Sequence, residues 1–318
     1  MSAETIISPP GGRALTAGAI ALVLMLCLTW GFNQIAIKLV LHDIPPYTQA
    51  MLRSAGALLV ILAIARMRGV KLFERDGTLK AGLFAGVLFG IEFVLIFHGL
   101  QFTTASRAAV FLYTMPFFVA FGSYQFLGER LRPVQWAGLA VSFAGVAVAI
   151  GVPQPDVTAD VLIGDLMIVA GAGLWAATTL VAKGTRLRFA APEKALGYQV
   201  ATSIPILGTA AWLFGETITR TPSPLSLSLM AFQAIWVVGT TFTLWFALVK
   251  TYSASKLSAF TFITPLFGVV GSYFIMHDTL SLTFGAAAIL VIAGLFLVNR
   301  PSSTAAAPRD ALLNVTKT

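Results

Sequence analysis

Long apolar runs separated by short polar breaks are the main pattern along the chain. Each run has about 20 residues, which is the length that an α-helix needs to cross the hydrocarbon core of a bilayer. Backbone polar groups cannot stay unpaired there, so each run is expected to be helical. The pattern predicts ten membrane-spanning helices, at 16–38, 46–66, 79–99, 105–126, 133–151, 160–182, 193–214, 227–249, 256–276 and 281–299.

The second half of the chain repeats the first. Residues 30–38 align with residues 175–183 at an offset of 145, and Pro116 aligns with Pro265 at an offset of 149. Because five crossings are an odd number, the second copy is expected to lie upside down relative to the first. The alignment predicts a first repeat at 16–151, a linker at 152–159 and a second repeat at 160–299.

The composition supports a membrane protein and excludes several other classes. Of the 318 residues, 57% are apolar and only 11% are charged, and the mean hydropathy is +0.85. Ordinary soluble domains have about 25% charged residues. We therefore exclude a soluble enzyme, a nucleic-acid-binding protein and a disordered chain, and we expect an all-α polytopic membrane protein.

The distribution of positive charge predicts the orientation of the chain. With the N-terminus inside, seventeen Lys and Arg side chains fall on the cytoplasmic side and three on the outer side. Cytoplasmic loops carry the excess of positive residues in membrane proteins. Both ends, 1–15 and 300–318, are therefore predicted to be cytoplasmic tails. The first apolar run is expected to remain in the protein, because it is too long for a signal peptide and contains Asn33 and Lys38.

The sequence indicates no metal or cofactor chemistry. Cys27 is the only cysteine and the three histidines are scattered, so no metal site is expected. Residues 171–176 match the spacing of a dinucleotide-binding fingerprint, but they lie inside a predicted span with no strand before them. The chain has no Walker loop, so ATP is not expected to drive it directly.

Two groups of residues carry a resemblance to a known family. They are Trp30-Gly31, Lys38 and Arg53 near the start, and then Thr103-Thr104-Ala105-Ser106-Arg107, Pro116, Gly128-Glu129-Arg130-Leu131, Trp136-Ala137-Gly138 and Ala144-Gly145. These residues resemble the EamA domain of the drug/metabolite transporter superfamily, and the resemblance covers roughly 16–299. It implies a ten-helix permease of the inner (plasma) membrane, often an exporter of amino acids or other metabolites. His277-Asp278 departs from the pattern, because Gly128-Glu129 stands at the equivalent place in the first copy.

Polar and aromatic side chains at helical spacing predict an internal substrate cavity. At 100° per residue, the stripe that begins at Trp30 shares one face of the first helix, and the stripe that begins at Trp175 shares the equivalent face of the sixth. Polar side chains in a span seldom face lipid, although hydrogen bonding between helices is an alternative use for them. The predicted substrate-binding residues are Trp30, Asn33, Gln34, Arg53, Glu92, Trp175, Thr178, Thr179, Tyr198, Thr202, Gln233, Trp236 and Thr240.

Arg53 and Glu92 are charged side chains that lie well inside predicted spans. Each lies about seven residues from the outer end of its helix, which places both roughly 10 Å below the outer interface. At a common depth they are able to form a structural ion pair or to offer opposite charges to a zwitterionic substrate. An unpaired Glu92 would also be able to carry a coupling proton.

Prolines and glycines predict where helices bend and where they pack closely. Pro116 and Pro265 lie at corresponding midpoints of the fourth and ninth spans, and such paired interruptions indicate a transport site or a gate. Gly82, Gly86 and Gly90 form a seam of small residues on the third span, which predicts close packing against a neighbouring helix.

The leading hypothesis is a secondary transporter that moves small metabolites across the inner membrane by alternating access. Amino acids or related amphipathic compounds are the preferred substrates, because Trp and Tyr side chains would bind their apolar or cationic parts. Alternatives are a drug or sugar-derivative transporter of the same fold, a passive channel, and an intramembrane enzyme acting on lipids. The expected partners are a small-molecule substrate and the lipid bilayer, without nucleic acid. The sequence leaves the oligomeric state open, and a monomer fits it.

Overall fold

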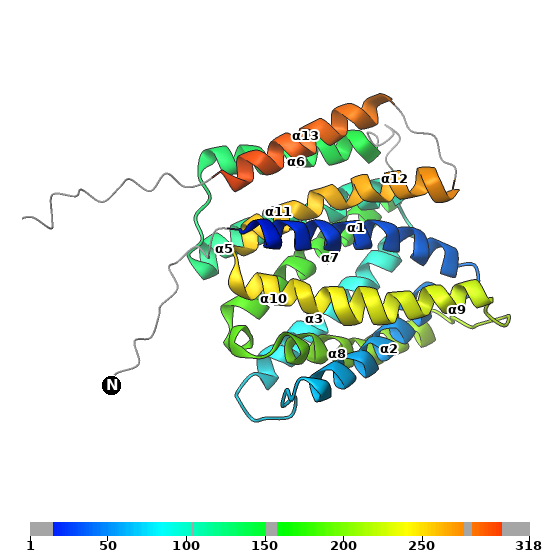
Figure 1. The fold of residues 1–318 in the computed structure, drawn as a ribbon. Helices are drawn as coiled ribbons and strands as arrows, with labels where there is room; N and C mark the ends of the chain where they lie inside the picture. The colour runs from blue at the N-terminus through cyan, green and yellow to red at the C-terminus, as the bar shows by residue number, and fades with distance from the viewer. Residues whose placement is uncertain (1–14, 104, 151–157, 277–281, 301–318) are drawn as a thin grey trace, which may run out of the picture.

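The computed structural model describes residues 15–103, 105–150, 158–276 and 282–300, which form an all-helical bundle (Figure 1). The predicted tails and linker lie almost entirely outside the described residues, as do His277 and Asp278. The α-helices are α1 (Ala17–Val40), α2 (Pro46–Met67), α3 (Leu79–Gly99), α4 (Ala105–Leu112), α5 (Met115–Leu127), α6 (Pro133–Ile150), α7 (Ala159–Gly184), α8 (Pro192–Leu213), α9 (Pro224–Ala231), α10 (Thr243–Thr251), α11 (Ala254–Phe260), α12 (Thr264–Met276) and α13 (Leu282–Asn299). Two 3-10 helices, η1 (Arg186–Phe189) and η3 (Thr261–Ile263), and one π-helix, η2 (Phe232–Phe242), complete the described helices.

Helix occupies each of the ten predicted apolar runs within the described residues. In the part of the chain that the structure describes, seven helical segments are long and apolar enough to cross a membrane, namely Ala17–Val40, Pro46–Met67, Leu79–Gly99, Arg107–Leu127, Ala159–Gly184, Pro224–Thr251 and Ala254–Ile275. Large apolar side chains, among them Leu59, Phe126 and Ile289, are exposed on the surface of the bundle. So large an exposed apolar surface is typical of a protein that lipid surrounds. The chain is therefore an all-helical polytopic membrane protein.

The two prolines at corresponding positions lie directly after interruptions of the helix. The span predicted at 105–126 is divided into α4 and α5 at Tyr113 and Thr114, and Pro116 is in the first turn of α5. The span predicted at 256–276 is divided into α11 and α12 by η3, and Pro265 is in the first turn of α12. Proline is tolerated there because the first backbone N–H groups of a helix need no partner within it.

Helices α6 and α13 lie side by side at one edge of the bundle (Figure 1), and their buried side chains share a core cluster with α1, α10 and α11. A Cβ atom added to Gly138 would lie 2.7 Å from the carbonyl oxygen of Gly294, so the two backbones are in direct contact. A Cβ atom on Gly145 would lie 2.9 Å from the carbonyl oxygen of Ala287. Between these contacts the Ser142 hydroxyl donates to the carbonyl oxygen of Val291 at 3.2 Å.

The predicted glycine seam packs α3 against α8. Gly82 faces the ring of Tyr198, Gly86 faces Thr202 and Gly90 faces Ile206. The partners follow each other at four-residue spacing, so one face of α8 lies along the whole seam. The prediction of close helix packing is confirmed. Because this face of α8 packs against α3, only the other faces of α8 are able to line a cavity or contact other helices.

Gly86→Ala is expected to destabilise the protein. The added Cβ would lie 2.5 Å from the Cβ of Thr202 and 2.8 Å from the Tyr198 carbonyl oxygen, so α3 and α8 must separate. Overpacking of this kind costs about 1–3 kcal/mol. Gly173→Ala in α7 is the matched control, because nothing lies within 4 Å of the added atom. The melting temperature in detergent should fall for Gly86→Ala only, and equal melting temperatures for the two variants would contradict this packing.

Candidate functional site

A cavity of about 410 Å³ lies inside the bundle. Its wall is formed by α1, α2, α3, α7, α10 and η2, with single residues from α4, α8 and α12. Leu41, Leu100 and Gln101 line one end and are exposed, so the cavity reaches the surface where α1 and α3 end. The volume lies within the range of about 300–1,000 Å³ that is typical of small-molecule sites.

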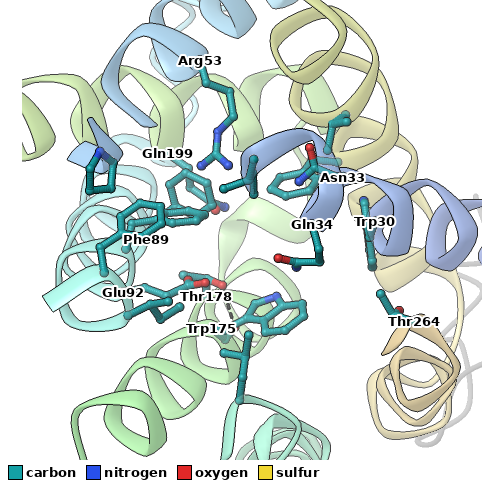
Figure 2. Close-up of a pocket in the computed structure, with 18 of the residues that line it drawn as sticks. Trp30, Asn33, Gln34, Arg53, Phe89, Glu92, Trp175, Thr178, Gln199 and Thr264 are labelled. Atoms are coloured by element: carbon teal, nitrogen blue, oxygen red, sulfur yellow. Dashed lines mark hydrogen bonds between the residues drawn. The ribbon is translucent and has the colours of Figure 1, made fainter. Parts of the chain in front are cut away.

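The structure brings many of the predicted residues together around this cavity (Figure 2). The stripes on α1 and α7, which hold equivalent positions in the two copies, turn toward the same space, as their helical spacing predicts. Eight of the thirteen predicted residues form part of the wall, namely Trp30, Asn33, Gln34, Arg53, Glu92, Trp175, Thr178 and Thr179.

Tyr198 and Thr202 are predicted site residues that lie outside the cavity wall. Both side chains point at the glycine seam of α3, and the Tyr198 hydroxyl lies 3.3 Å from the Thr78 hydroxyl. Gln199, the next residue along α8, faces the cavity instead. One step along a helix turns the side chain by 100°. The polar residues of α8 are thus divided between two faces, and the glycine seam determines the division.

Three predicted residues of η2 also lie outside the wall. Gln233 accepts a hydrogen bond from Gln49 of α2 at 3.3 Å. Trp236 is 40% exposed, and its indole N–H donates to the Thr29 hydroxyl at 3.3 Å. Thr240 is half-buried, and its hydroxyl donates to the carbonyl oxygen of Ile235 at 2.8 Å. In this structure these side chains make contacts between and within helices.

Several wall residues were not predicted from the sequence. They are chiefly aromatic or single polar residues: Phe89, Phe93, Phe97, Tyr113, Gln199, Phe242, Trp245, Phe246 and Thr264. An aromatic side chain in an apolar run has the same pattern whether it faces a cavity or the packed core. For Gln199 the only available signal is that a polar side chain within a span seldom faces lipid.

Arg53 and Glu92 point into the cavity from facing sides (Figure 2). Arg53 is 3% exposed and Glu92 is 5% exposed. The Nε and Nη2 atoms of Arg53 and the Oε2 atom of Glu92 have no hydrogen-bond partner, and neither side chain belongs to an ion pair within the described residues. The guanidinium carbon of Arg53 lies 4.5 Å from the centroid of the Phe93 ring. Within the described residues, the cavity therefore has a cation on one side and an acid on the other, which attract each other without forming a contact ion pair.

Other polar atoms in the wall also lack partners. They are Oδ1 of Asn33, Nε2 of Gln199 and Oγ1 of Thr264. Buried polar groups are normally hydrogen-bonded, so unpaired groups gathered around one cavity are available to a ligand. The hydroxyls of Thr178 and Thr179 differ from them, because they donate to the carbonyl oxygen of Trp175 at 2.7 and 3.4 Å.

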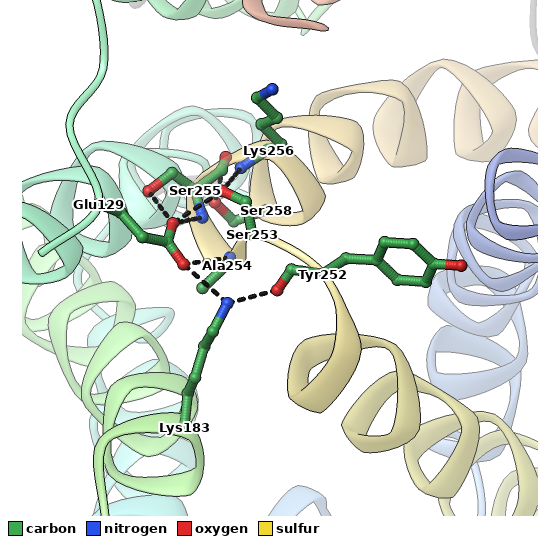
Figure 3. Close-up of polar contacts among 8 residues, drawn as sticks. All are labelled: Glu129, Lys183, Tyr252, Ser253, Ala254, Ser255, Lys256 and Ser258. Carbon is green, nitrogen blue, oxygen red and sulfur yellow. Dashed lines mark hydrogen bonds and ion pairs between the residues drawn. The ribbon is translucent and has the colours of Figure 1, made fainter. Parts of the chain in front are cut away.

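At the opposite end of the bundle, a network centred on Glu129 joins three helix ends (Figure 3). The Glu129 carboxylate, which follows α5, accepts hydrogen bonds from Lys183 of α7 at 2.7 Å and from the Ser253 hydroxyl at 2.7 Å. It also accepts from the backbone N–H groups of Ala254 and Ser255 at 3.1 and 3.3 Å, so it caps the start of α11. Lys183 donates in addition to the Tyr252 carbonyl oxygen.

The charge of Glu129 is stabilised by this network. Burial raises the pKa of the carboxyl, but the charge of Lys183 and the hydrogen bonds that the carboxylate accepts outweigh burial and bring the pKa below the usual value. A lowered pKa means that the network stabilises the fold above the ordinary pKa of glutamate, near 4.3, and that this contribution is lost as the pH falls through the lowered value. At neutral pH the network is fully formed.

A lipid-facing helical bundle around a small-molecule cavity defines the class of membrane transporters. The family model described as the EamA-like transporter family matches residues 17–151 and 162–300. The chain belongs to this family, within the drug/metabolite transporter superfamily. The two matches cover the two halves in which the sequence repeat was found.

Curated relatives and a solved structure agree with this assignment. The chain is 25% identical over 297 residues to the uncharacterized transporter YoaV of Bacillus subtilis, covering 86% of this chain and 94% of that protein. It is 29% identical over 292 residues to a probable amino-acid metabolite efflux pump of Salmonella typhimurium, covering 87% and 93%. The uncharacterized inner membrane transporter YedA of Escherichia coli is 24% identical over 296 residues, covering 89% and 92%. A solved crystal structure shares the fold, with a TM-score of 0.77 at 21% identity over 89% of this chain and 96% of the other.

The family assignment defines the partners and the location of the protein. It is a multi-pass protein of the plasma membrane, the lipid bilayer surrounds it, and it acts on a small-molecule substrate.

Proposed function

We propose that the protein is a secondary transporter that exports amino acids or closely related amphipathic metabolites, and that it does not act as an enzyme. The observation that carries this proposal is the pair of buried, unpaired charges, Arg53 and Glu92, which face each other across the cavity. A zwitterion presents one carboxylate and one ammonium group, so it is able to satisfy both charges at once. Two of the curated relatives are described as probable amino-acid metabolite efflux pumps.

The helices are proposed to cross the membrane ten times in two inverted five-helix repeats. The pairing of helices supports this arrangement. Gly31 of α1 lies against Thr264 and Gly268 of α12, and Ala176, the counterpart of Gly31 in α7, belongs to the same core cluster as Met115 and Val119 of α5. Thr264 and Gly268 stand 149 residues after Met115 and Val119. Exchanging the two halves therefore reproduces the same helix contacts, as a two-fold axis between the repeats requires.

The orientation with both ends in the cytoplasm implies an outward-facing conformation. The excess of Lys and Arg places the network of Glu129 and Lys183 on the cytoplasmic side. The cavity then opens outward at Leu41 and Leu100, and the network closes the inner end. Alternating access requires such a closed end, and the helix breaks before Pro116 and Pro265 are proposed as the places where the gates move.

Counterflow in proteoliposomes tests the proposed function. Vesicles that contain the purified protein are loaded with one unlabelled amino acid, and uptake of the same labelled amino acid is then followed. A carrier should give transient, saturable accumulation above that of protein-free vesicles. Absence of counterflow for all twenty amino acids would refute the amino-acid part of the proposal, and non-saturable flux would indicate a channel.

Glu92→Gln is expected to remove the dependence of transport on a pH difference. Glu92 is proposed to carry a coupling proton, because its carboxyl is buried in the wall of the cavity and one oxygen has no partner. Glutamine keeps a similar shape but cannot exchange a proton. Efflux should accelerate with an inward proton gradient in the wild type and not in the variant, while counterflow at high substrate concentration persists. Glu216→Gln is the control, since Glu216 lies outside the cavity wall and caps α2. If Glu92→Gln kept the wild-type pH dependence, Glu92 would not be the coupling residue.

A further inference from the structure

The two cavity tryptophans occupy corresponding positions but differ in their surroundings. Trp30 and Trp175 stand 145 residues apart, one in each copy of the repeat, and both line the cavity. The indole N–H of Trp30 donates to the Thr241 hydroxyl at 2.9 Å. Its ring meets Phe242 and Trp245 edge-on, with ring centroids 5.7 and 5.4 Å apart. Trp30 is 8% exposed, so it forms a rigid part of the wall with its polar atom satisfied.

Glu92 stands where the repeat places the counterpart of Thr241. The two residues are 149 positions apart. Thus the position whose hydroxyl fixes Trp30 in one copy carries a carboxyl group in the other copy. A Cβ atom on Gly171 would lie 3.5 Å from the carbonyl oxygen of Glu92, so α3 contacts α7 at Glu92, one turn before Trp175. Figure 2 shows Glu92 and Trp175 on the side of the cavity that faces Arg53.

Trp30 and Thr241 are joined by a hydrogen bond, but their counterparts Trp175 and Glu92 are not. Within the described residues, the indole N–H of Trp175 donates no hydrogen bond, and Oε2 of Glu92 accepts none although it is buried. An unpaired buried carboxylate costs free energy unless a cation compensates it. The same part of the chain has no group of three or more His, Cys, Asp or Glu side chains placed to hold a metal ion. Arg53 on the facing side attracts this charge without touching it. A ligand ammonium group beside Glu92 would supply the contact that the carboxylate lacks.

We propose that Glu92 and Trp175 bind the ammonium group of the substrate, while Arg53 on the facing side binds its carboxylate. The carboxylate of Glu92 supplies charge and hydrogen-bond acceptors, and the indole ring attracts an ammonium group through its π-electrons. Trp30 and Thr241 are the neutral counterparts, and Trp30, held in place by Thr241, shapes the space for the apolar part of the substrate. This proposal rests on the amino-acid transport proposed above, and it assigns unequal roles to two tryptophans that the repeat makes equivalent.

Three ligands that share a side chain and differ in their charged ends test the subsite. Leucine carries both charges, 3-methylbutylamine carries only the ammonium group, and 2-hydroxy-4-methylpentanoate carries only the carboxylate. Binding of each to the full-length purified protein is measured by calorimetry. Glu92→Thr, which copies Thr241 of the other repeat, should weaken leucine and 3-methylbutylamine at least about tenfold and change the hydroxy acid by less than about twofold. Trp175→Leu should show the same selectivity with a smaller effect, about three- to tenfold.

Thr241→Val and Trp30→Leu are the matched variants of the other copy. Both should change the affinities of the three ligands by equal factors, because neither side chain is assigned to a charged group. The melting temperature of every variant shows whether a loss of binding comes from misfolding. Glu92→Gln, which nearly keeps the shape of the side chain, is measured as the more conservative variant. Equal losses of all three ligands in Glu92→Thr would overturn the subsite and leave amino-acid transport standing. A wild-type protein that binds neither leucine nor any other amino acid would overturn the transport proposal itself.

Discussion

Glu129→Gln is expected to open the end of the bundle that the proposed orientation places in the cytoplasm. The side chain of Glu129 is 5% exposed and that of Lys183 is 16% exposed, and together they join α5, α7 and the start of α11. Removal of one partner from a buried ion pair costs about 3–5 kcal/mol, because the other charge is left without compensation. Since 1.4 kcal/mol corresponds to a factor of ten, the inward-open population should rise by a factor of ten or more.

Labelling of a reporter cysteine measures this opening. Cys27, the only natural cysteine, is buried, and Cys27→Ala gives a background without thiols. Gln199→Cys then places a reporter in the cavity wall, on the inner half of α8 in the proposed orientation. Labelling by a membrane-impermeant maleimide from the cytoplasmic side should become faster in Glu129→Gln. Glu216→Gln removes a carboxylate at the other end of the bundle and should leave this rate unchanged. Equal rates in all three proteins would show that the network is not a gate.

The periodicity of polar residues predicted the part of the site that comes from regular helices. Asn33 and Gln34 are in the cavity wall because α1 is a regular helix, so the face read from the sequence is the face that forms. The sequence repeat then predicted that the equivalent face of α7, which begins at Trp175, also lines the cavity. The same reasoning placed Arg53 and Glu92 at a common depth, and the structure has them on facing sides of one cavity.

The remaining site residues depend on packing that a single sequence does not contain. In η2 the hydroxyl of Thr240 bonds five residues back, to Ile235, so the face calculated for an α-helix does not apply to Gln233 or Trp236. On α8 the choice between Tyr198 and Gln199 is made by the glycines of α3, which accept one face of the helix and leave the other free. Both outcomes are determined by neighbouring helices.

Helix packing is similar in the two copies of the internal repeat, whereas the residues proposed to bind substrate include positions at which the two copies differ. Gly138 meets Gly294 and Gly145 meets Ala287 in a symmetric contact, which serves packing alone. At Glu92 the repeat would supply a threonine, as at Thr241, but it supplies a carboxyl group. The repeat does not require a charge at Glu92, and among the described residues no neighbouring side chain forms a contact ion pair with it. Its presence is therefore not explained by the packing of the helices. Substrate binding is a reason for its presence, because functional sites keep groups that cost stability.

Arg53→Leu is therefore expected to weaken transport strongly without destabilising the protein. Arg53 is buried and has two nitrogen atoms without hydrogen-bond partners, so its removal relieves a desolvation cost. The change loses only the contact with the Phe93 ring and a long-range attraction to Glu92, and it breaks no contact ion pair among the described residues. Counterflow should fall at least about tenfold, the effect of losing one charge-assisted contact to the substrate. The melting temperature should stay the same or rise. Arg107→Leu is the control, because Arg107 is ion-paired with the buried Asp165, and breaking such a pair costs about 3–5 kcal/mol. If Arg53→Leu lowered the melting temperature as much as Arg107→Leu does, Arg53 would be a structural residue, and the zwitterion site would lose its positive side.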